Sequence, residues 1–126
     1  MRVVITGGGG FLGLKLAKAL LACDGLATTG SAKTPLSKLV LLDAAFPDSV
    51  PADPRLEAIT GDVSDAATLE RVLTPDTASL FHLAAVVSGA AEADFELGDR
   101  VNLEGTRRLL ERARRCTRPP RLDISL

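Results

Sequence analysis

The sequence is poor in several features that mark particular classes of protein. It has no large excess of charge of either sign, because it contains 15 Lys and Arg and 16 Asp and Glu. The resulting net charge of −1 attracts neither nucleic acid nor anionic lipid. It has no apolar run of the roughly 18 residues that cross a bilayer. Its only two cysteines, Cys23 and Cys116, have no metal-ligand spacing and suit a reducing compartment. We therefore expect a cytoplasmic protein with a small-molecule partner, no bound metal and no membrane contact.

The residues that are present indicate one globular domain. Apolar residues make up 46% and charged residues 25% of the 126 residues, close to the averages for globular proteins. A chain of this length can bury one hydrophobic core and not two. We therefore expect a single domain over residues 1–126.

Strand and helix patterns alternate along the chain. Apolar runs bounded by turn residues predict strands at Arg2–Thr6, Lys38–Asp43, Leu56–Thr60, Ser79–Leu83 and Leu122–Leu126. Helical periodicity predicts helices at Phe11–Ala22, from the N-cap Ser64 to about Leu73, and from about Asp94 to Arg115. Strands that alternate with helices favour a parallel sheet with right-handed crossovers, so the predicted fold class is α/β, a doubly wound parallel sheet.

Residues Thr6–Gly13 read T-G-G-G-G-F-L-G and lie between the first predicted strand and the first predicted helix. Gly7 permits a tight turn, Gly10 lets the backbone approach a diphosphate, and Gly13 lets the helix pack closely on the sheet. The N–H groups and the positive dipole at the helix start, at Phe11 and Leu12, then face the phosphates. The alternative, glycines that only make a turn, is disfavoured because strand, spacing and helix all agree.

Two further observations narrow the class of nucleotide. A nucleotide-triphosphate loop is excluded, because Leu14 stands where that loop requires a lysine. Asp43 ends the second predicted strand, where a carboxylate can accept hydrogen bonds from both hydroxyls of an adenosine ribose and would repel a 2′-phosphate. Ala44 and Ala45 follow it and no arginine is adjacent, which favours NAD over NADP. The alternative is an acid that simply closes a strand.

Three more segments carry a family resemblance: G-D-V-S-D at Gly61–Asp65, H-L-A-A at His82–Ala85 and N-L-E-G-T at Asn102–Thr106. With the glycine turn, they resemble the extended short-chain dehydrogenase/reductases, also called the NAD-dependent epimerase/dehydratase family, over nearly the whole chain. A-A-V-V-S-G at Ala84–Gly89 and E-A-D-F at Glu92–Phe95 are most similar to the members that oxidise sugar acids such as D-erythronate.

The resemblance implies an NAD(P)-binding Rossmann fold with NAD as the cofactor. It implies that Asp62 contacts the exocyclic amine of adenine and that Val63 contacts the ring by packing and through its backbone. It also implies that Leu83, Ala84 and Ala85 line the cofactor channel, where small side chains let the chain approach the ribose and diphosphate closely.

Other polar residues are candidates for a role in the cofactor site. His82 is the only histidine, and its place at the end of a buried strand favours a packed, hydrogen-bonded residue over a catalytic one. Asn102 lies within a predicted helix, and its amide can bond a loop beside the nicotinamide, as a cofactor-binding or a structural residue. A basic cluster late in that helix complements its negative end and is expected to lie in water. The cluster comprises Arg107, Arg108, Arg112, Arg114, Arg115 and Arg118.

The groups that would perform the reaction are missing. Hydride transfer from an alcohol needs a base, for which the resembled family uses a tyrosine whose pKa a nearby lysine lowers. This chain has no tyrosine, and its lysines all precede the third predicted strand, so we assign no catalytic residue. The family's catalytic serine would follow the fifth strand. We expect a domain incomplete at its carboxy-terminal end, with one sheet face partly uncovered and with Asp123 costly to bury in its strand.

The first functional hypothesis is therefore the NAD-binding portion of a dehydrogenase that oxidises a hydroxyl of a sugar acid. The alternatives are a fragment of a nucleotide-sugar epimerase or dehydratase and a non-catalytic NAD-binding module. The predicted partner is a sugar acid or sugar derivative, and a homodimer is compatible with the full-length form.

Overall fold

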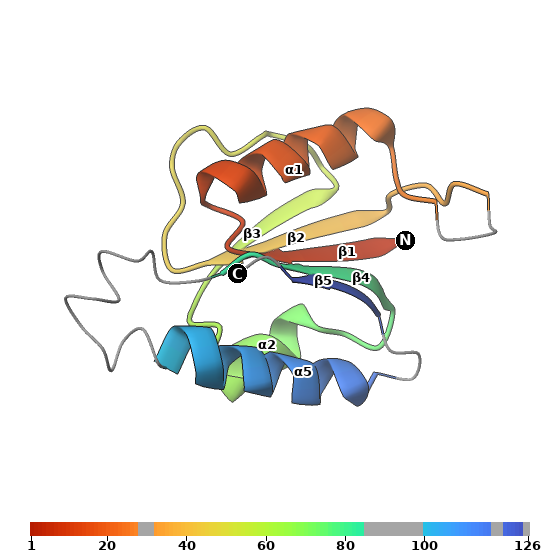
Figure 1. Ribbon diagram of the computed structural model, residues 1–126. Coiled ribbons are helices and arrows are strands. Elements are labelled where there is room, and N and C mark those ends of the chain that lie inside the picture. Colours follow the sequence, from red (N-terminus) through yellow and green to blue (C-terminus); the bar gives the residue numbers. More distant parts are fainter. Residues whose placement is uncertain (28–31, 85–99, 117–119, 125–126) are drawn as a thin grey trace.

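The computed structural model describes residues 1–27, 32–84, 100–116 and 120–124, without the side chains of residues 100–102 and 124. These residues form the predicted parallel α/β sheet, with five strands in the order β3-β2-β1-β4-β5 (Figure 1). The strands are β1 Arg2–Thr6, β2 Lys38–Asp43, β3 Leu56–Thr60, β4 Thr77–His82 and β5 Arg121–Ile124. The predicted fold class is confirmed.

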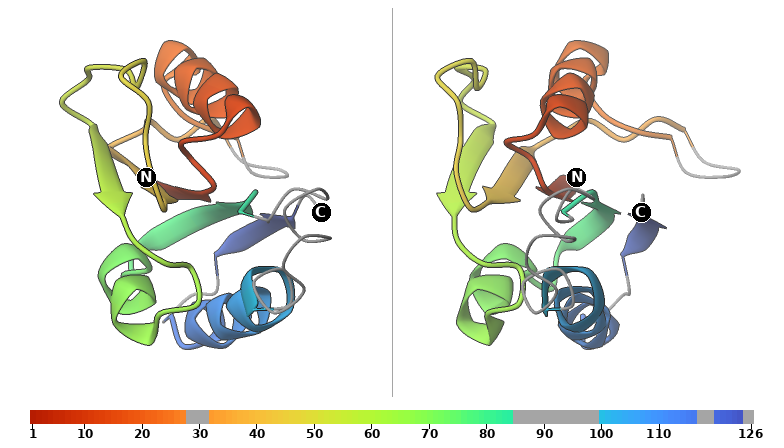
Figure 2. Two further views of the ribbon diagram at one scale, coloured as in Figure 1. Left: turned by 90° about the vertical axis from the view of Figure 1, so that its left-hand side faces the viewer. Right: turned by 60° about the vertical axis from the view of Figure 1, so that its left-hand side comes forward.

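Helices cover both faces of the sheet. Helix α1 (Phe11–Cys23) lies on one face, and α2 (Ala66–Val72) and α5 (Thr106–Arg114) lie together on the other, as Figure 2 shows. A π-helical turn, η1 (Arg100–Gly105), leads directly into α5. Within the described ranges, no helix combines the length and the apolar character that a membrane crossing demands.

The strands divide their side chains between these two faces. In β1, Val3 and Ile5 pack with Ala17 and Leu20 of α1, whereas Val4 packs with residues of α2 and α5. In β4, Leu80 lies on the α2/α5 face and its neighbour Phe81 on the α1 face. The central strands are therefore apolar on both sides, as expected of a parallel sheet between two helical layers.

The first half of the chain matches the predicted elements more closely than the second half. Strands β1, β2 and β3 have the predicted bounds, and α1 extends one residue beyond its predicted end. Strand β4 begins earlier than predicted, because Thr77 pairs with Arg2 at the start of β1. The predicted strand at 122–126 begins at Arg121, and residues 94–99 and 125–126 lie outside the described part of the chain.

The predicted N-cap of α2 was wrong by one residue. The cap is Asp65, whose Oδ2 accepts hydrogen bonds from the backbone N–H of Thr68 at 3.0 Å and from its hydroxyl at 2.7 Å. Ser64 instead donates to the Asp62 carboxylate, through its N–H at 2.8 Å and its hydroxyl at 2.6 Å. Ser and Asp are about equally good caps, so local sequence alone does not separate two adjacent candidates.

The expected cost of burying Asp123 is also wrong. Asp123 lies in β5 opposite Phe81, its side chain is 44% exposed, and it pairs with Arg121 at 3.5 Å. Strand β5 is at the edge of the described sheet, where the carboxylate keeps contact with water. The acid is therefore tolerated without a buried partner.

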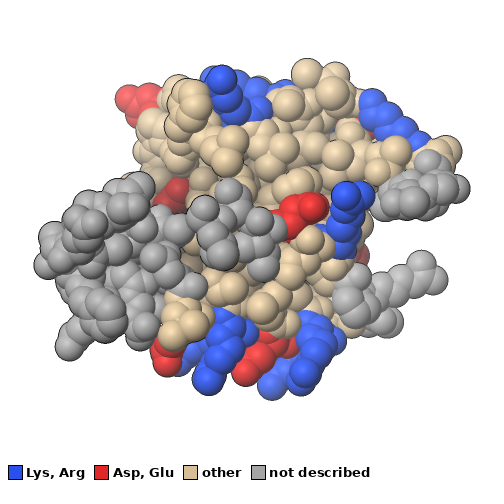
Figure 3. All heavy atoms as spheres, in the orientation of Figure 1, with Lys and Arg blue, Asp and Glu red and all other residues tan. Residues whose placement is uncertain are grey.

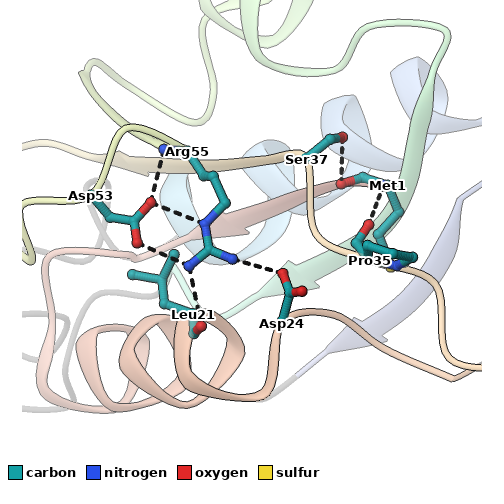
Figure 4. Close-up of polar contacts among 7 residues, drawn as sticks. All are labelled: Met1, Leu21, Asp24, Pro35, Ser37, Asp53 and Arg55. Carbon is teal, nitrogen blue, oxygen red and sulfur yellow. Dashed lines mark hydrogen bonds and ion pairs between the residues drawn. The ribbon is translucent and has the colours of Figure 1, made fainter.

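A polar cluster joins the carboxy-terminal end of α1 to the loop before β3 (Figure 4). The Arg55 guanidinium donates to Asp53, to Asp24 and to the carbonyl of Leu21. These hydrogen bonds with Arg55 hold the pKa of the Asp53 carboxyl at about 2, below its ordinary 3.8. On the same view, the Met1 ammonium donates to the Pro35 carbonyl at 2.6 Å. These contacts lie at the amino-terminal ends of β1 and β3, opposite the glycine turn, and anchor the sheet there.

Candidate functional site

The predicted site residues follow the carboxyl ends of β1, β2, β3 and β4, which meet at one edge of the sheet. The glycine turn of residues 7–10 leads from β1 to α1, and Asp43 ends β2. The sheet order is β3-β2-β1-β4-β5, and the helices α1 and α5, which follow β1 and β4 along the chain, lie on opposite faces (Figure 2). The strand order therefore reverses between β1 and β4. In open α/β sheets, ligands bind in the crevice outside the strand ends at such a reversal.

Two of the three predicted glycines are required by the protein's own packing. Gly7 has a φ of +73°, a backbone conformation that residues with side chains rarely adopt. A Cβ at Gly7 would lie 2.7 Å from the backbone of Leu83 and of Ala84. A Cβ at Gly13 would lie 2.3 Å from the Gly7 carbonyl oxygen, which is why α1 can begin so close to the end of β1.

Gly10 differs from its neighbours in the turn. It has an extended backbone (φ −80°, ψ 172°), which any residue can adopt. A Cβ at this position would meet only the Gly7 carbonyl oxygen, at an ordinary contact distance of 3.4 Å. Nothing in the described chain therefore requires a glycine here, although a ligand lying on the open side of the turn would.

The beginning of α1 carries unused hydrogen-bond donors. Leu14 is the first residue of the helix to donate, to the Gly10 carbonyl at 2.9 Å. Gly10 provides no side-chain cap and the first turn holds no acid, so within the described residues the N–H groups of Phe11, Leu12 and Gly13 have no acceptor. An anion at this helix start would satisfy the three donors and the positive end of the helix dipole.

The side chains at the same helix start are open to solvent. Phe11 is 78% exposed and Leu12 is 53% exposed, so the inward stripe of α1 is Gly13, Ala17 and Leu20. The Lys15 ammonium lies 4.8 Å from the centre of the Phe11 ring. A cation thus stands one turn from the N–H groups that have no acceptor in the described chain, where it adds to the attraction for an anion.

The end of β2 holds the glycine turn from one side. The N–H groups of Gly7 and Gly8 both donate to the Leu42 carbonyl, at 2.7 and 3.2 Å. The Gly9 N–H donates to Oδ2 of Asp43 at 2.9 Å, and Oδ1 of Asp43 accepts from the Ala44 N–H at 2.7 Å. Asp43 therefore lies against the turn, as the predicted ribose contact requires.

The end of β4 holds the turn from the other side, through a buried chain of polar contacts. His82 is 1% exposed, and its Nδ1 lies 2.6 Å from the Thr6 hydroxyl while Nε2 lies 2.8 Å from the Thr106 hydroxyl. The same Thr6 hydroxyl accepts from the Ala84 N–H at 3.4 Å, and the Thr6 carbonyl accepts from the Leu83 N–H at 3.0 Å. The predicted packed and hydrogen-bonded role of His82 is confirmed.

Burial lowers the pKa of His82 below its ordinary value of 6.5. The imidazole is therefore neutral at neutral pH, and its two nitrogens serve as one donor and one acceptor between the two hydroxyls. The chain of contacts ties β1, β4 and α5 together beside Leu83 and Ala84, both of which are half-buried.

The predicted adenine contacts follow β3. Asp62 accepts two hydrogen bonds from Ser64, and Val63 is buried with the core residues under α2 and α5. The Gly61 N–H donates to the Asp43 carbonyl at 2.9 Å, which places this segment beside the end of β2. The adenine contact of Asp62 and Val63 stays a prediction.

The sequence did not reveal the role of Arg108. Its Nη1 donates to the Ser64 carbonyl at 2.8 Å, so one member of the basic cluster braces the segment after β3 instead of lying free in water. Within α5, Arg107 pairs with Glu111, and Arg108 also pairs with Glu104 of η1. Figure 3 shows basic and acidic side chains close together along this edge of the molecule. The expectation that the whole cluster lies in water is therefore wrong for Arg108, whose partner Ser64 is 44 positions away in the chain.

Two residues predicted to bind the cofactor, Ala85 and Asn102, lie wholly or partly outside the described residues. Ala85 lies outside the described residues, as do the segments of residues 86–89 and 92–95 that carried the finer resemblance. The backbone of Asn102 lies in η1, and its side chain is outside the described part. Their predicted contacts with the cofactor stay predictions.

Comparisons with known proteins agree with this geometry. The model of the 3-beta hydroxysteroid dehydrogenase/isomerase family matches residues 4–118. A D-erythronate dehydrogenase from Cupriavidus necator is 49% identical over 97% of this chain, which covers 37% of that protein. A second, from Haemophilus influenzae, is 39% identical over 91% of the chain and 34% of its own length. The chain thus spans about a third of the length of the curated relatives it matches.

Solved structures show the same fold. A nucleoside-diphosphate-sugar epimerase from Agrobacterium tumefaciens superposes with a TM-score of 0.82 at 31% identity, over 98% of this chain and 36% of that one. A variant of uronate dehydrogenase from the same organism, complexed with NAD, superposes with a TM-score of 0.75 at 25% identity. That match covers 98% of this chain and 40% of the uronate dehydrogenase.

Proposed function

The chain belongs to the 3-beta hydroxysteroid dehydrogenase/isomerase family, and from this premise we propose that it is the NAD-binding domain of an NAD-dependent dehydrogenase. The substrate is the hydroxyl group of a sugar acid, by analogy with the two D-erythronate dehydrogenases and the uronate dehydrogenase that it resembles. The domain comprises residues 1–126, and the residues that bind and oxidise the substrate belong to sequence outside them.

The observation that carries this proposal is the open side of the glycine turn. A diphosphate of the cofactor fits beside Gly10, where the described residues leave room. Three N–H groups at the adjacent start of α1 also have no acceptor within those residues. Phe11, Leu12 and Gly13 donate to the phosphate oxygens, and Lys15 adds a positive charge nearby.

The remaining residues bind the rest of the cofactor. Asp43 accepts from the hydroxyls of the adenosine ribose and disfavours the 2′-phosphate of NADP. Asp62 and Val63 contact the adenine, Leu83, Ala84 and Ala85 line the channel, and Asn102 supports the nicotinamide end. When bound, NAD supplies the hydride acceptor. With no tyrosine in the chain, the base that takes the hydroxyl proton comes from outside residues 1–126.

The proposed compartment is the cytoplasm. Both Cys23 and Cys116 are free thiols, and Cys116 is buried, as suits a reducing environment. The proposed partners are the cofactor and a small substrate rather than nucleic acid, because the net charge is −1 and two arginines of α5, Arg107 and Arg108, pair with glutamates.

A nucleotide-sugar epimerase is the second candidate function. It is favoured by the superposition with the nucleoside-diphosphate-sugar epimerase, which has the higher TM-score of the two structures described. Both candidates need the same NAD site, so net reduction of added NAD by a sugar acid distinguishes the dehydrogenase in the full-length protein. An epimerase returns the hydride to its substrate and accumulates no NADH.

The NAD site is tested by calorimetric titration of two matched glycine variants. Gly10→Ala places its methyl group in the proposed diphosphate space, so we expect NAD affinity to fall by at least about tenfold while the free energy of unfolding changes by less than about 0.5 kcal/mol. Gly13→Ala forces its methyl group against the Gly7 carbonyl and lowers both NAD affinity and stability. Unchanged NAD binding by Gly10→Ala, or equal affinities of the parent for NAD and NADP, would contradict the proposal.

A further inference from the structure

Asp43 makes contacts that a residue dedicated to a ribose does not need. Its two carboxylate oxygens accept hydrogen bonds from two different backbone N–H groups. One belongs to Gly9 in the turn, and the other to Ala44 in the loop that follows β2. The hydrogen bond from Ala44 restricts the rotation of the carboxylate and so orients Oδ2 toward the Gly9 N–H. Asp43 therefore connects the end of β2 to a point in the turn 34 residues earlier.

The turn is pressed closely against this carboxylate. A Cβ at Gly9 would lie 2.4 Å from the Ala45 carbonyl oxygen and 3.1 Å from Oδ2 of Asp43. Beyond Gly9, the Gly10 N–H donates to the Gly7 carbonyl at 3.2 Å, and the Gly10 carbonyl accepts from Leu14. Gly9 thus lies where the chain has left β1 and is about to enter α1, and its position sets the direction of the first helical N–H groups.

The N–H groups of residues 7–9 in the turn form one set, those of residues 11–13 at the start of α1 form a second, and the two sets differ in their partners. Those of Gly7, Gly8 and Gly9 are all taken by the end of β2, through the Leu42 carbonyl and the Asp43 carboxylate. Those of Phe11, Leu12 and Gly13 have no acceptor within the described residues. The contacts of the first set hold the second set in place before any ligand arrives.

We propose that Asp43 is a positioning residue for the cofactor diphosphate, in addition to its contact with the ribose. This inference rests on the NAD site proposed above. Its carboxylate holds Gly9 so that the free N–H groups at the start of α1 face the crevice. Two N–H bonds leave lone pairs on both oxygens, because a carboxylate offers about four acceptor sites, so the ribose contact is compatible with this role.

Electrostatics alone predicts the opposite effect on an anion. Asp43 places a negative charge beside the diphosphate site, and removing a like charge strengthens the binding of an anion. If Asp43 positions the turn, removing it weakens that binding. The sign of the change therefore separates the two effects, provided the probe cannot reach Asp43 through ribose hydroxyls.

The probe is 2′,3′-dideoxy-ADP, which retains the adenine and the diphosphate but lacks both hydroxyls. We expect Asp43→Ala to bind it roughly tenfold more weakly than the parent, the scale of one hydrogen bond to a charged group, and Asp43→Asn to fall between the two. Asp48→Ala is the matched control, because it removes an exposed carboxylate from the same loop and should leave the affinity unchanged. Equal or tighter binding by Asp43→Ala would overturn the inference.

A second readout needs no ligand. In the parent, the Gly9 amide should exchange slowly with solvent, and Asp43→Ala should speed its exchange while the amides of Val4 and Ile5 in β1 keep theirs. An unchanged Gly9 amide would show that the carboxylate does not hold the turn. If the parent binds neither NAD nor ADP, the proposed function fails, and the Gly9 amide still decides whether Asp43 holds the turn.

Discussion

The two faces of the sheet differ in how completely they are covered. On the α2/α5 face, Leu69 and Leu109 of the two helices are fully buried with Val4 and Leu80 of the strands. On the α1 face, one helix covers Val3 and Ile5, but Phe81 and Leu83 are only half-buried. Among the described residues, the α1 face is therefore the less covered one over β4, and we call it the open face and the α2/α5 face the closed face. The expectation that a covering helix is missing from one face stays a prediction.

Each face also has its own polar contact at the edge of the sheet where the carboxyl ends of the strands meet. On the closed face, the buried Thr6 and His82 and the half-buried Thr106 form a chain of contacts between β1, β4 and α5. On the open face, Asp43 bonds the Gly9 N–H at the entrance to α1. The polar contact of the closed face is therefore mostly shielded from water, whereas that of the open face lies beside the exposed start of α1.

The largest expected effect compares adjacent residues of β4. Leu80→Ala leaves a cavity on the closed face and should lower the free energy of unfolding by about 3 kcal/mol. Phe81→Ala removes more carbon atoms from the open face, yet should cost only about 1 kcal/mol because that side chain is already half in water. Urea denaturation measures both values. Equal losses from the two substitutions would show that the faces are equally closed.

A smaller effect concerns the pH dependence of the closed face. Because burial lowers the pKa of His82 below 6.5, the unfolded chain binds a proton more readily than the folded one. Stability should therefore be complete above pH 6.5 and fall as the pH drops below it, by at most about 1.4 kcal/mol per pH unit. Chemical denaturation between pH 7 and about 5 measures this slope.

The control for that slope is His82→Gln, which should be nearly independent of pH over the same range. His82 is the only histidine in the chain, so no other imidazole contributes there. A slope that persists in His82→Gln would assign the effect to another group and remove the pH distinction between the two faces.

The smallest expected effect lies on the open face at β5. Asp123 faces the same side as Phe81, and its pair with Arg121 is exposed to solvent. Asp123→Asn should therefore change the free energy of unfolding by less than about 0.5 kcal/mol, as is usual for exposed ion pairs. A loss of several kcal/mol in thermal or urea unfolding would mean that β5 is more enclosed than its exposed carboxylate indicates.

The sequence predicted best what depends on residues close together in the chain. The bounds of β1, β2 and β3 follow from short apolar runs that end at Gly, Asp or Thr, and the glycine spacing located the turn. The N-cap of α2 was missed because Ser64 and Asp65 are adjacent and chemically equivalent as caps.

Contacts across the sheet were not predictable in the same way. Asp43 was identified as a site residue, but its bond to Gly9 depends on the register of β2 against β1. The bond from Arg108 to Ser64 depends on how α5 packs beside α2, and the partners of His82 depend on two separate strand and helix ends. Periodicity shows which face a residue occupies and does not name the residue it meets.

Gly10 separates what the fold needs from what binding needs. Its surroundings accept a methyl group at 3.4 Å, whereas those of Gly7 and Gly13 do not. If the proposed NAD site is correct, a single substitution at position 10 removes cofactor binding and leaves the sheet intact. Under that proposal, the residue at position 10 of related chains marks whether the turn binds a diphosphate.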